Sequence, residues 1–175
     1  MGCGINIHCK CGDRGLMLGV GMGFPIVYQE TMQNIRDGKY GKEMKRLVEE
    51  NELVTVDASL TPYLCENCGL IEENICLDLY RPSDIEAARK AVIGNWTAAE
   101  PRNNSTVEEL GGWPYWTVPD DVLAENEGKY VLFREYEHMC PECKTLMKKV
   151  TEPFENLKCP KCGEKYEVFQ DMLWD

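Results

Sequence analysis

Two segments in the N-terminal half carry apolar residues at helical spacing. Side chains at i, i+4 and i+7 share one face of a helix, so the pattern predicts a helix that ends at Asp37-Gly38 and a second that ends near Asn51. The apolar stripes are Tyr28, Met32 and Ile35 in the first helix and Tyr40, Met44, Leu47 and Val48 in the second.

Strands are predicted where apolar and polar residues alternate, because that period is typical of half-buried sheet. The alternation places Leu77 and Leu79 on the buried side of one strand and predicts that Cys76 faces the other way. The predicted strands cover residues 53–57, 61–65, 71–80, 130–136, 145–150 and 165–169.

A further helix is predicted near residues 83–93, where Ser83-Asp84-Ile85-Glu86 has the pattern of a capping box. Beyond it, residues 96–128 are rich in Pro, Gly, Asn and acidic residues, a composition typical of a connecting segment. The aromatic run Trp113-Pro114-Tyr115-Trp116 suits either a protein partner or the chain's own core. We favour the core, since buried aromatics dominate core energetics as they do interfaces.

Alternating glycines over residues 16–25 suggest a phosphate-binding loop, but Phe24 occupies the position of the last glycine in the dinucleotide fingerprint. The lysine of a P-loop is also missing. We therefore expect these glycines to let the backbone pass close to another element.

The strongest motif lies in the tail. Cys140-x2-Cys143 and Cys159-x2-Cys162 are separated by fifteen residues, which is typical of four-thiolate zinc sites. With its flanking strands, this order resembles the zinc-ribbon, or rubredoxin-like, class of folds over about residues 130–170. The resemblance implies a metal-binding module, which proteins of very different function share.

A second site is predicted from Cys65-x2-Cys68-Gly69, because half a tetrahedral site requires another pair. The opening segment supplies it in one of two ways. Cys9 with Cys11 gives four thiolates through a tighter turn, whereas His8 with Cys11 keeps the usual two-residue spacing. We favour Cys9, since zinc ribbons most often use four cysteines. The competing interpretation is that these cysteines are merely small buried residues.

The predicted fold is therefore α+β, with two zinc-ribbon β modules and a short α-helical insertion in the first. The domains are residues 1–95, the acidic Trp-rich connector 96–128, and the C-terminal ribbon 129–175. The pattern Leu-Gly-Val-Gly-Met-x-Phe-Pro after a cysteine hairpin is similar to that of uncharacterised bacterial zinc-ribbon proteins, a similarity that names no activity. Cys76 is a distant third choice of ligand, and Cys3 is expected to be a free thiol.

The net charge of −11 is unevenly distributed. Residues 1–128 hold eleven Lys/Arg against twenty-one Asp/Glu, and residues 129–175 hold eight against nine. Because nonspecific DNA affinity comes from cations that neutralise phosphates, the acidic part should repel a duplex. Nucleic acid is therefore possible only at residues 129–175. The candidate contacts are Lys144, Lys148, Lys149, Lys158, Lys161 and Lys165.

We predict a cytoplasmic protein, because the chain lacks a membrane-spanning apolar run and a secretory signal. Eight of the ten cysteines fall in close pairs, which is how intracellular chains present thiolates to metal.

Four thiolates leave no open coordination position, which indicates structural rather than catalytic metal. His8 and His138 are the only histidines, and no hydrolase pattern accompanies them. We expect a non-enzymatic adaptor with two zinc ions and an acidic surface for a protein partner. The alternatives are a nucleic-acid-associated ribbon factor, a nucleic-acid mimic of the inhibitor type, and a rubredoxin-like electron carrier with iron at the C-terminal site.

Overall fold

A computed structural model of the chain describes residues 2–12, 16–21, 25–89, 130–151 and 153–174. These residues are strand-rich with few helices, in agreement with the predicted α+β class. They belong to two units that interleave along the chain. Unit 1 comprises Met1–Phe24, Ala58–Cys76 and Tyr136–Asp175, and unit 2 comprises Pro25–Asp57 and Leu77–Glu135. The predicted domain boundaries next to residues 96 and 128, the connector between them and its aromatic run lie outside the described residues.

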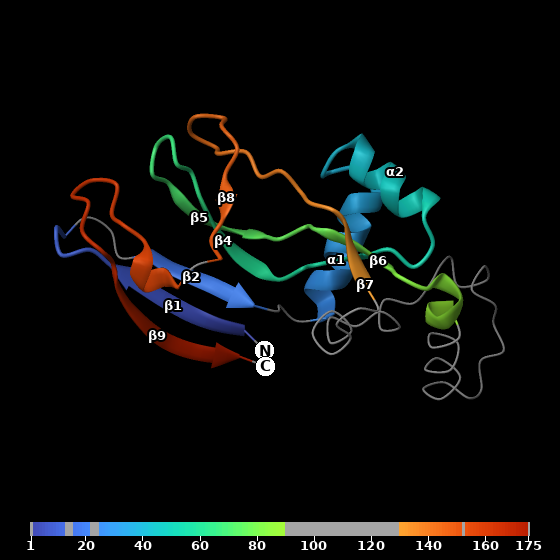
Figure 1. Ribbon diagram of the computed structural model, residues 1–175, viewed down its shortest axis with the longest axis horizontal. Helices are drawn as coiled ribbons and strands as arrows, with labels where there is room; N and C mark the ends of the chain where they lie inside the picture. Colours follow the sequence, from blue (N-terminus) through green and yellow to red (C-terminus); the bar gives the residue numbers. More distant parts are fainter. Residues whose placement is uncertain (1, 13–15, 22–24, 90–129, 152, 175) are drawn as a thin grey trace. The chain divides into compact units, whose positions relative to one another are not determined.

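Unit 1 is built on an antiparallel sheet with the strand order β5-β4-β2-β1-β9, in which β8 also pairs with β4 (Figure 1). The first and last strands of the chain lie side by side, with Gly2 opposite Trp174. The strands are β1 (Gly2–His8), β2 (Leu16–Gly21), β4 (Leu60–Leu64), β5 (Ile71–Ile75), β8 (Lys148–Lys149) and β9 (Glu167–Trp174).

The core of unit 1 forms on one face of β1 and β2, as alternation requires. Ile5 and Ile7 of β1 pack with Leu18 of β2, and all three are buried. The same cluster contains Cys9 and Cys159, so two cysteines of the predicted metal sites are part of the apolar core.

Gly19 in β2 lies where the backbone passes close to other elements, as the glycine pattern predicts. A Cβ atom there would meet Leu60 Cδ1 at 2.8 Å and Glu73 Oε2 at 2.9 Å. The Gly19 amide donates a hydrogen bond to the Glu73 carboxylate of β5. Because β2 and β4 pair only at Gly21 and Leu60, this carboxylate satisfies an amide that strand pairing does not reach.

Unit 2 contains α1 (Pro25–Arg36), α2 (Lys42–Glu50) and a small sheet in the order β3-β6-β7. Its strands are β3 (Thr55–Val56), β6 (Leu79–Pro82) and β7 (Tyr130–Arg134).

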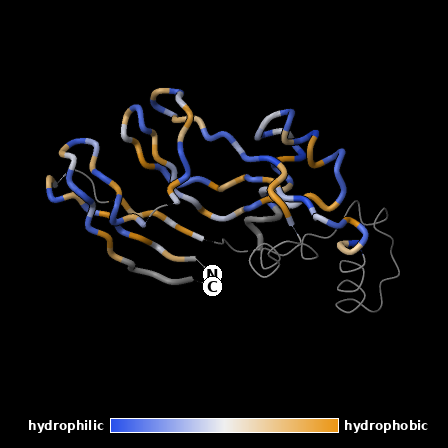
Figure 2. The backbone as a smooth tube through the Cα atoms, viewed as in Figure 1, coloured by the Kyte–Doolittle hydropathy of each residue, from blue (hydrophilic) through white to orange (hydrophobic). Residues whose placement is uncertain are grey.

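The predicted helical stripes of unit 2 are confirmed at Met32, Ile35, Met44 and Val48, which are buried. Figure 2 shows α2 as a mainly hydrophilic segment interrupted by its apolar positions. Gly38 ends the first helix with a φ of 79°, a left-handed conformation that favours glycine. None of the described helices combines the length and the apolarity needed to cross a membrane.

The predicted strand over residues 71–80 is wrong as a single element. β5 ends at Ile75 and β6 begins at Leu79, because Leu77 adopts a φ of 66° and breaks the extended backbone. Cys76 is fully buried instead of facing out. β5 belongs to unit 1, whereas β6 belongs to unit 2, where it pairs with β7. Alternation alone could not reveal this division.

The third predicted helix is present over residues 85–89, at the edge of the described part of the chain. Asp84 caps it, since its Oδ1 accepts a hydrogen bond of 3.0 Å from the Ala87 amide. The cap therefore lies one residue beyond Ser83. Glu86 forms an ion pair with Arg89, which also binds Glu52.

The first testable prediction concerns Glu73. Glu73→Ala should lower the free energy of unfolding by about 1–2 kcal/mol, because it removes the acceptor of the Gly19 amide. Glu72→Ala, the neighbouring change on β5, should stay within about 0.5 kcal/mol. Urea unfolding of both variants measures the difference, and equal stabilities would show that the Glu73 contact contributes nothing.

Candidate metal centres

Three of the four cysteine pairs lie on turns with the same backbone hydrogen bonds. In each turn, the amide four residues after the first cysteine donates to that cysteine's carbonyl, at 2.8 Å for Gly69, 3.0 Å for Lys144 and 2.8 Å for Gly163. The first cysteine's own amide donates to the carbonyl of the residue five positions later. These bonds hold both sulfurs of a pair on the same side of the turn.

The opening pair forms a turn that is one residue shorter. The Gly12 amide donates to the Cys9 carbonyl at 3.0 Å, and Gly12 has a φ of 74°. The single residue between Cys9 and Cys11 therefore still yields a closed turn with a left-handed glycine after it. This geometry answers how a Cys-x-Cys segment can replace the usual Cys-x2-Cys hairpin.

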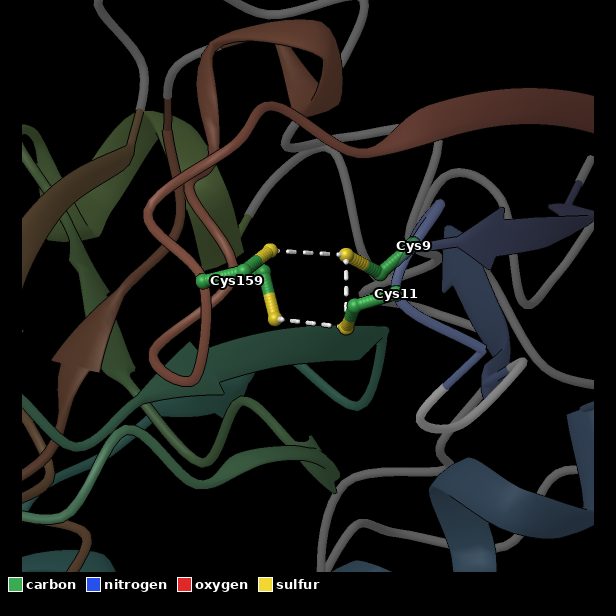
Figure 3. A group of neighbouring side chains, drawn as sticks. Cys9, Cys11 and Cys159 are labelled. Atoms are coloured by element: carbon green, nitrogen blue, oxygen red, sulfur yellow. Dashed lines mark hydrogen bonds between the residues drawn. The ribbon is translucent and has the colours of Figure 1, made fainter.

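Cluster 1 consists of Cys9, Cys11, Cys159 and Cys162. The sulfur of Cys9 lies 3.2 Å from that of Cys11 and 3.3 Å from that of Cys162, and Cys11 lies 3.9 Å from Cys159. Figure 3 shows Cys9 and Cys11 facing Cys159 from the opposite segment. The N-terminal turn and the last turn of the chain therefore build one site.

Cluster 2 consists of Cys65, Cys68, Cys140 and Cys143. Cys65 Sγ lies 3.4 Å from Cys143 Sγ, and Cys68 Sγ lies 3.6 Å from Cys140 Sγ. Tyr63 and Met147 surround it as buried apolar neighbours. Both clusters lie within unit 1.

The predicted grouping of the pairs is wrong. The sequence favours a tail site of Cys140/Cys143 with Cys159/Cys162 and an N-terminal site of Cys9/Cys11 with Cys65/Cys68, but the structure exchanges the partners. Strand pairing is the physical reason. β9 pairs with β1 and brings the last turn to the first, whereas β8 pairs with β4 and brings the 140–144 turn to the 65–69 turn. Residues 129–175 therefore hold half of each cluster and no complete site.

His8 lies outside cluster 1. It is exposed, and its ring lies edge-on to Phe169 with 5.9 Å between centroids. The structure thus places Cys9 rather than His8 beside Cys11. Cys3 and Cys76 belong to neither cluster.

The donor set fits a divalent ion with a preference for sulfur. In a tetrahedral zinc–thiolate centre, a Zn–S bond of about 2.3 Å places the sulfurs roughly 3.8 Å apart. The sulfurs of each cluster all lie within 4.8 Å of one another. Each cluster also pairs buried cysteines with more exposed ones, so that the ion would lie between the core and the surface.

The thiols of each cluster differ in acidity. Hydrogen bonds from Thr145, Asn67 and the Thr145 amide lower the pKa of Cys143 to about 5. The amides of Cys162 and Lys161 lower the pKa of Cys159 to about 6. A hydrogen bond from Thr145 also lowers the pKa of Cys65. Each cluster therefore contains at least one cysteine that its surroundings favour as a thiolate, the form that binds metal.

In each cluster another cysteine has a raised pKa, because it lies close to other thiols. The Cys11 amide lowers the pKa of Cys9, but hydrogen bonds with the Cys11 and Cys162 thiols and burial outweigh it and raise that pKa to about 12. The Leu70 amide likewise lowers the pKa of Cys68, and the neighbouring thiols and burial raise it to about 12. A bound cation would replace these protons, as thiolate–metal sites require.

Two hydroxyl groups at the clusters escaped the sequence analysis. Thr145 Oγ1 lies 3.0 Å from Cys143 Sγ and 3.2 Å from Cys65 Sγ. Tyr166 is buried in the same group of packed residues as Cys9 and Cys159 of cluster 1. Such contacts orient ligands and tune their basicity. Thr145 is recognisable by its position two residues after Cys143, whereas no local signal marks Tyr166.

The two clusters also touch through their turns. A Cβ atom on Gly69 would lie 2.2 Å from Pro160 Cβ and 2.6 Å from Pro160 Cγ. Gly69 follows Cys68 of cluster 2, and Pro160 follows Cys159 of cluster 1. The bare glycine therefore lets the two turns pack directly on each other.

Comparisons with protein-family models, with curated proteins and with solved structures find no match to this chain. The interpretation of the clusters accordingly rests on their geometry and donor chemistry.

Metal stoichiometry of paired variants tests the exchanged grouping. The variants Cys11→Ser/Cys162→Ser and Cys68→Ser/Cys143→Ser should each keep one tightly bound metal ion, because each removes ligands from a single cluster. Cys11→Ser/Cys68→Ser should keep none. Elemental analysis of the purified chains reads out the result. The grouping favoured by the sequence gives the reverse outcome, in which Cys11→Ser/Cys68→Ser keeps one ion and Cys11→Ser/Cys162→Ser loses both.

The contact between the turns gives a further prediction. Gly69→Ala should destabilise the chain more than Gly163→Ala does, because both residues have positive φ but only Gly69 faces a proline ring. The backbone strain common to both is about 1–2 kcal/mol, and overpacking adds about 1–3 kcal/mol at Gly69. Urea unfolding of the two variants compares them directly. Equal losses would mean that the Gly69–Pro160 contact is not tight.

Proposed function

We propose that this chain is a zinc protein whose two four-thiolate centres close a pair of interleaved zinc ribbons, and that it acts as a non-enzymatic, acidic adaptor for a protein partner. The supporting observation is the composition of the clusters. Each consists of four cysteines on two facing turns, and these four thiolates complete the tetrahedral coordination of one ion. Such a centre holds a scaffold together and leaves no position for substrate or water.

Electrostatics supports a protein partner with a basic surface. A divalent ion bound to four thiolates carries two negative charges, so two filled centres take the net charge of the chain from −11 to −15. This added charge lies in unit 1, which contains the tail with its lysines. Concentrated negative charge steers basic partners and repels phosphate chains.

The lysines of residues 129–175 also favour a protein partner over nucleic acid. Several of them already bind neighbouring groups. Lys148 pairs with Glu66 at 2.8 Å, Lys144 donates to the Pro141 carbonyl at 2.8 Å, and Lys165 donates to Asn156 at 3.4 Å. Since residues 129–175 complete neither cluster, the tail alone is not expected to form the basic ribbon that a nucleic-acid role needs.

The test uses the purified full chain in three measurements. Elemental analysis should find two zinc ions in a colourless protein. In a gel-retardation measurement at low salt, the purified chain of residues 1–175 should leave a DNA duplex unretarded. A pull-down with this bait should retain a basic protein that elutes as salt shortens the Debye length to about 3 Å near 1 M. The Cys11→Ser/Cys68→Ser chain serves as the matched bait, and it should lose that partner together with the metal.

Other outcomes would replace the proposal. A red iron–thiolate protein that is reversibly reduced would support rubredoxin-like electron transfer instead. Salt-dependent binding to a duplex would support the nucleic-acid role. A partner that binds the metal-free bait equally well would show that the two centres do not support the interaction surface.

A further inference from the structure

Cys76 lies outside both clusters in a buried polar environment. Cys76 follows β5 directly and is fully buried. Its carbonyl accepts a hydrogen bond from Tyr63 Oη at 3.3 Å and is paired with His138 Nε2 at 3.0 Å. Its amide donates to the Ser59 carbonyl at 2.9 Å. Both sides of the Cys76 backbone are therefore held by hydrogen bonds, and burial restricts the rotation of its side chain.

The sulfur itself is paired with an amine. Lys149 Nζ donates a hydrogen bond to Cys76 Sγ at 2.9 Å. Lys149 lies in β8 opposite Tyr63 of β4, and it is half-buried. Its neighbour Lys148 is exposed and pairs with Glu66. The two adjacent lysines of β8 thus have different surroundings: Lys148 lies at the surface, and Lys149 contacts a buried sulfur.

We propose that Cys76 and Lys149 form an oxidative modification site, at which a peroxide converts the hydrogen-bonded pair into a covalent sulfur–nitrogen crosslink. This inference rests on the Cys76–Lys149 geometry and is independent of the metal and adaptor proposals. Lys149 Nζ is a nitrogen nucleophile within hydrogen-bond distance of this sulfur. Proximity of this kind converts a bimolecular reaction into an intramolecular one.

The chemistry balances in two steps. In the first, the Cys76 sulfur attacks one oxygen of hydrogen peroxide, the O–O bond breaks, and the departing oxygen takes a proton and leaves as water, which gives a sulfenic acid. In the second, the neutral Lys149 amine attacks the sulfenic sulfur and the S–O bond breaks. The leaving hydroxide takes a proton from nitrogen, and a second water departs. The sulfur loses two electrons, the peroxide gains them, and the product is a sulfenamide.

The crosslink would join the two hairpins that carry cluster 2. Cys76 ends the β4–β5 hairpin, which holds the 65–69 turn, and Lys149 lies just after the segment that holds the 140–144 turn. Burial of Cys76 keeps bulky thiols away from the sulfenic acid, so the amine at 2.9 Å has the advantage over intermolecular disulfide formation. The modification would therefore tie β5 and β8 together without changing the ligands of either cluster.

Peptide mapping of the full metal-loaded chain after dilute hydrogen peroxide tests the site. The wild type should give a crosslinked peptide containing residues 76 and 149 that is lighter by about 2 Da than its reduced components and is reversed by a thiol reductant. Lys149→Met should abolish the crosslink and leave Cys76 to proceed to sulfinic acid. Lys149→Arg should do the same, because it keeps the charge but lacks the amine. Lys148→Met is the matched control and should retain the crosslink.

Two results would overturn the inference. One is wild-type Cys76 without a crosslink at a peroxide dose that fully oxidises Cys3, the other cysteine outside the clusters. The other is equal loss of the crosslink in Lys148→Met and Lys149→Met. Metal content of each variant is measured in parallel to verify its fold, and the wild-type map decides the question even where a Lys149 variant loses its metal.

Discussion

The pairing of the outermost strands is the interaction on which this architecture depends. β1 and β9, the first and last strands along the chain, pair antiparallel over most of their length, and β9 forms one edge of the sheet in unit 1. The same pairing places the first and last cysteine turns opposite each other, 148 residues apart in the chain between Cys11 and Cys159. The shorter β4–β8 pairing does the same for Cys68 and Cys140, which are 72 residues apart. Both clusters are consequences of sheet topology.

The cysteine clusters form part of the small buried core of unit 1. Cysteines make up a large share of the buried residues of unit 1. Cys9 and Cys159 belong to the apolar core around Ile7. Cys65 and Cys140 belong to the group of buried residues around Tyr63. A core of this size has little apolar area to offset chain entropy, and metal–thiolate bonds at the clusters would add stability between distant segments. Closing long loops in this way costs little extra, because loop entropy grows only logarithmically with length.

Local chemistry could be predicted from the sequence, and long-range pairing could not. Helical spacing located Met32, Ile35, Met44 and Val48 correctly, and the cysteine motifs located the turns whose sulfurs gather in the two clusters. Which turns meet was predicted wrongly, because the spacing within a cysteine pair does not identify its partner pair, which strand pairing decides. Lys144 shows the limit of local rules, since it adopts a φ of 58° where the three other turns have glycine. Cys76 shows a second limit of local rules. It is buried because the extended backbone breaks at Leu77, which the alternation of apolar and polar residues does not predict.

The interleaving of the clusters sets an order on biosynthesis. Each cluster takes its second pair from residues at or beyond Cys140, so neither group of four is complete until the ribosome has passed Cys143 for cluster 2 or Cys162 for cluster 1. Until then Cys9, Cys11, Cys65 and Cys68 wait as incomplete pairs, available to other metals or oxidants. A metal ion would therefore find four sulfurs at either cluster only after the second pair has been made, and a chain cut short before Cys140 would hold half of each cluster.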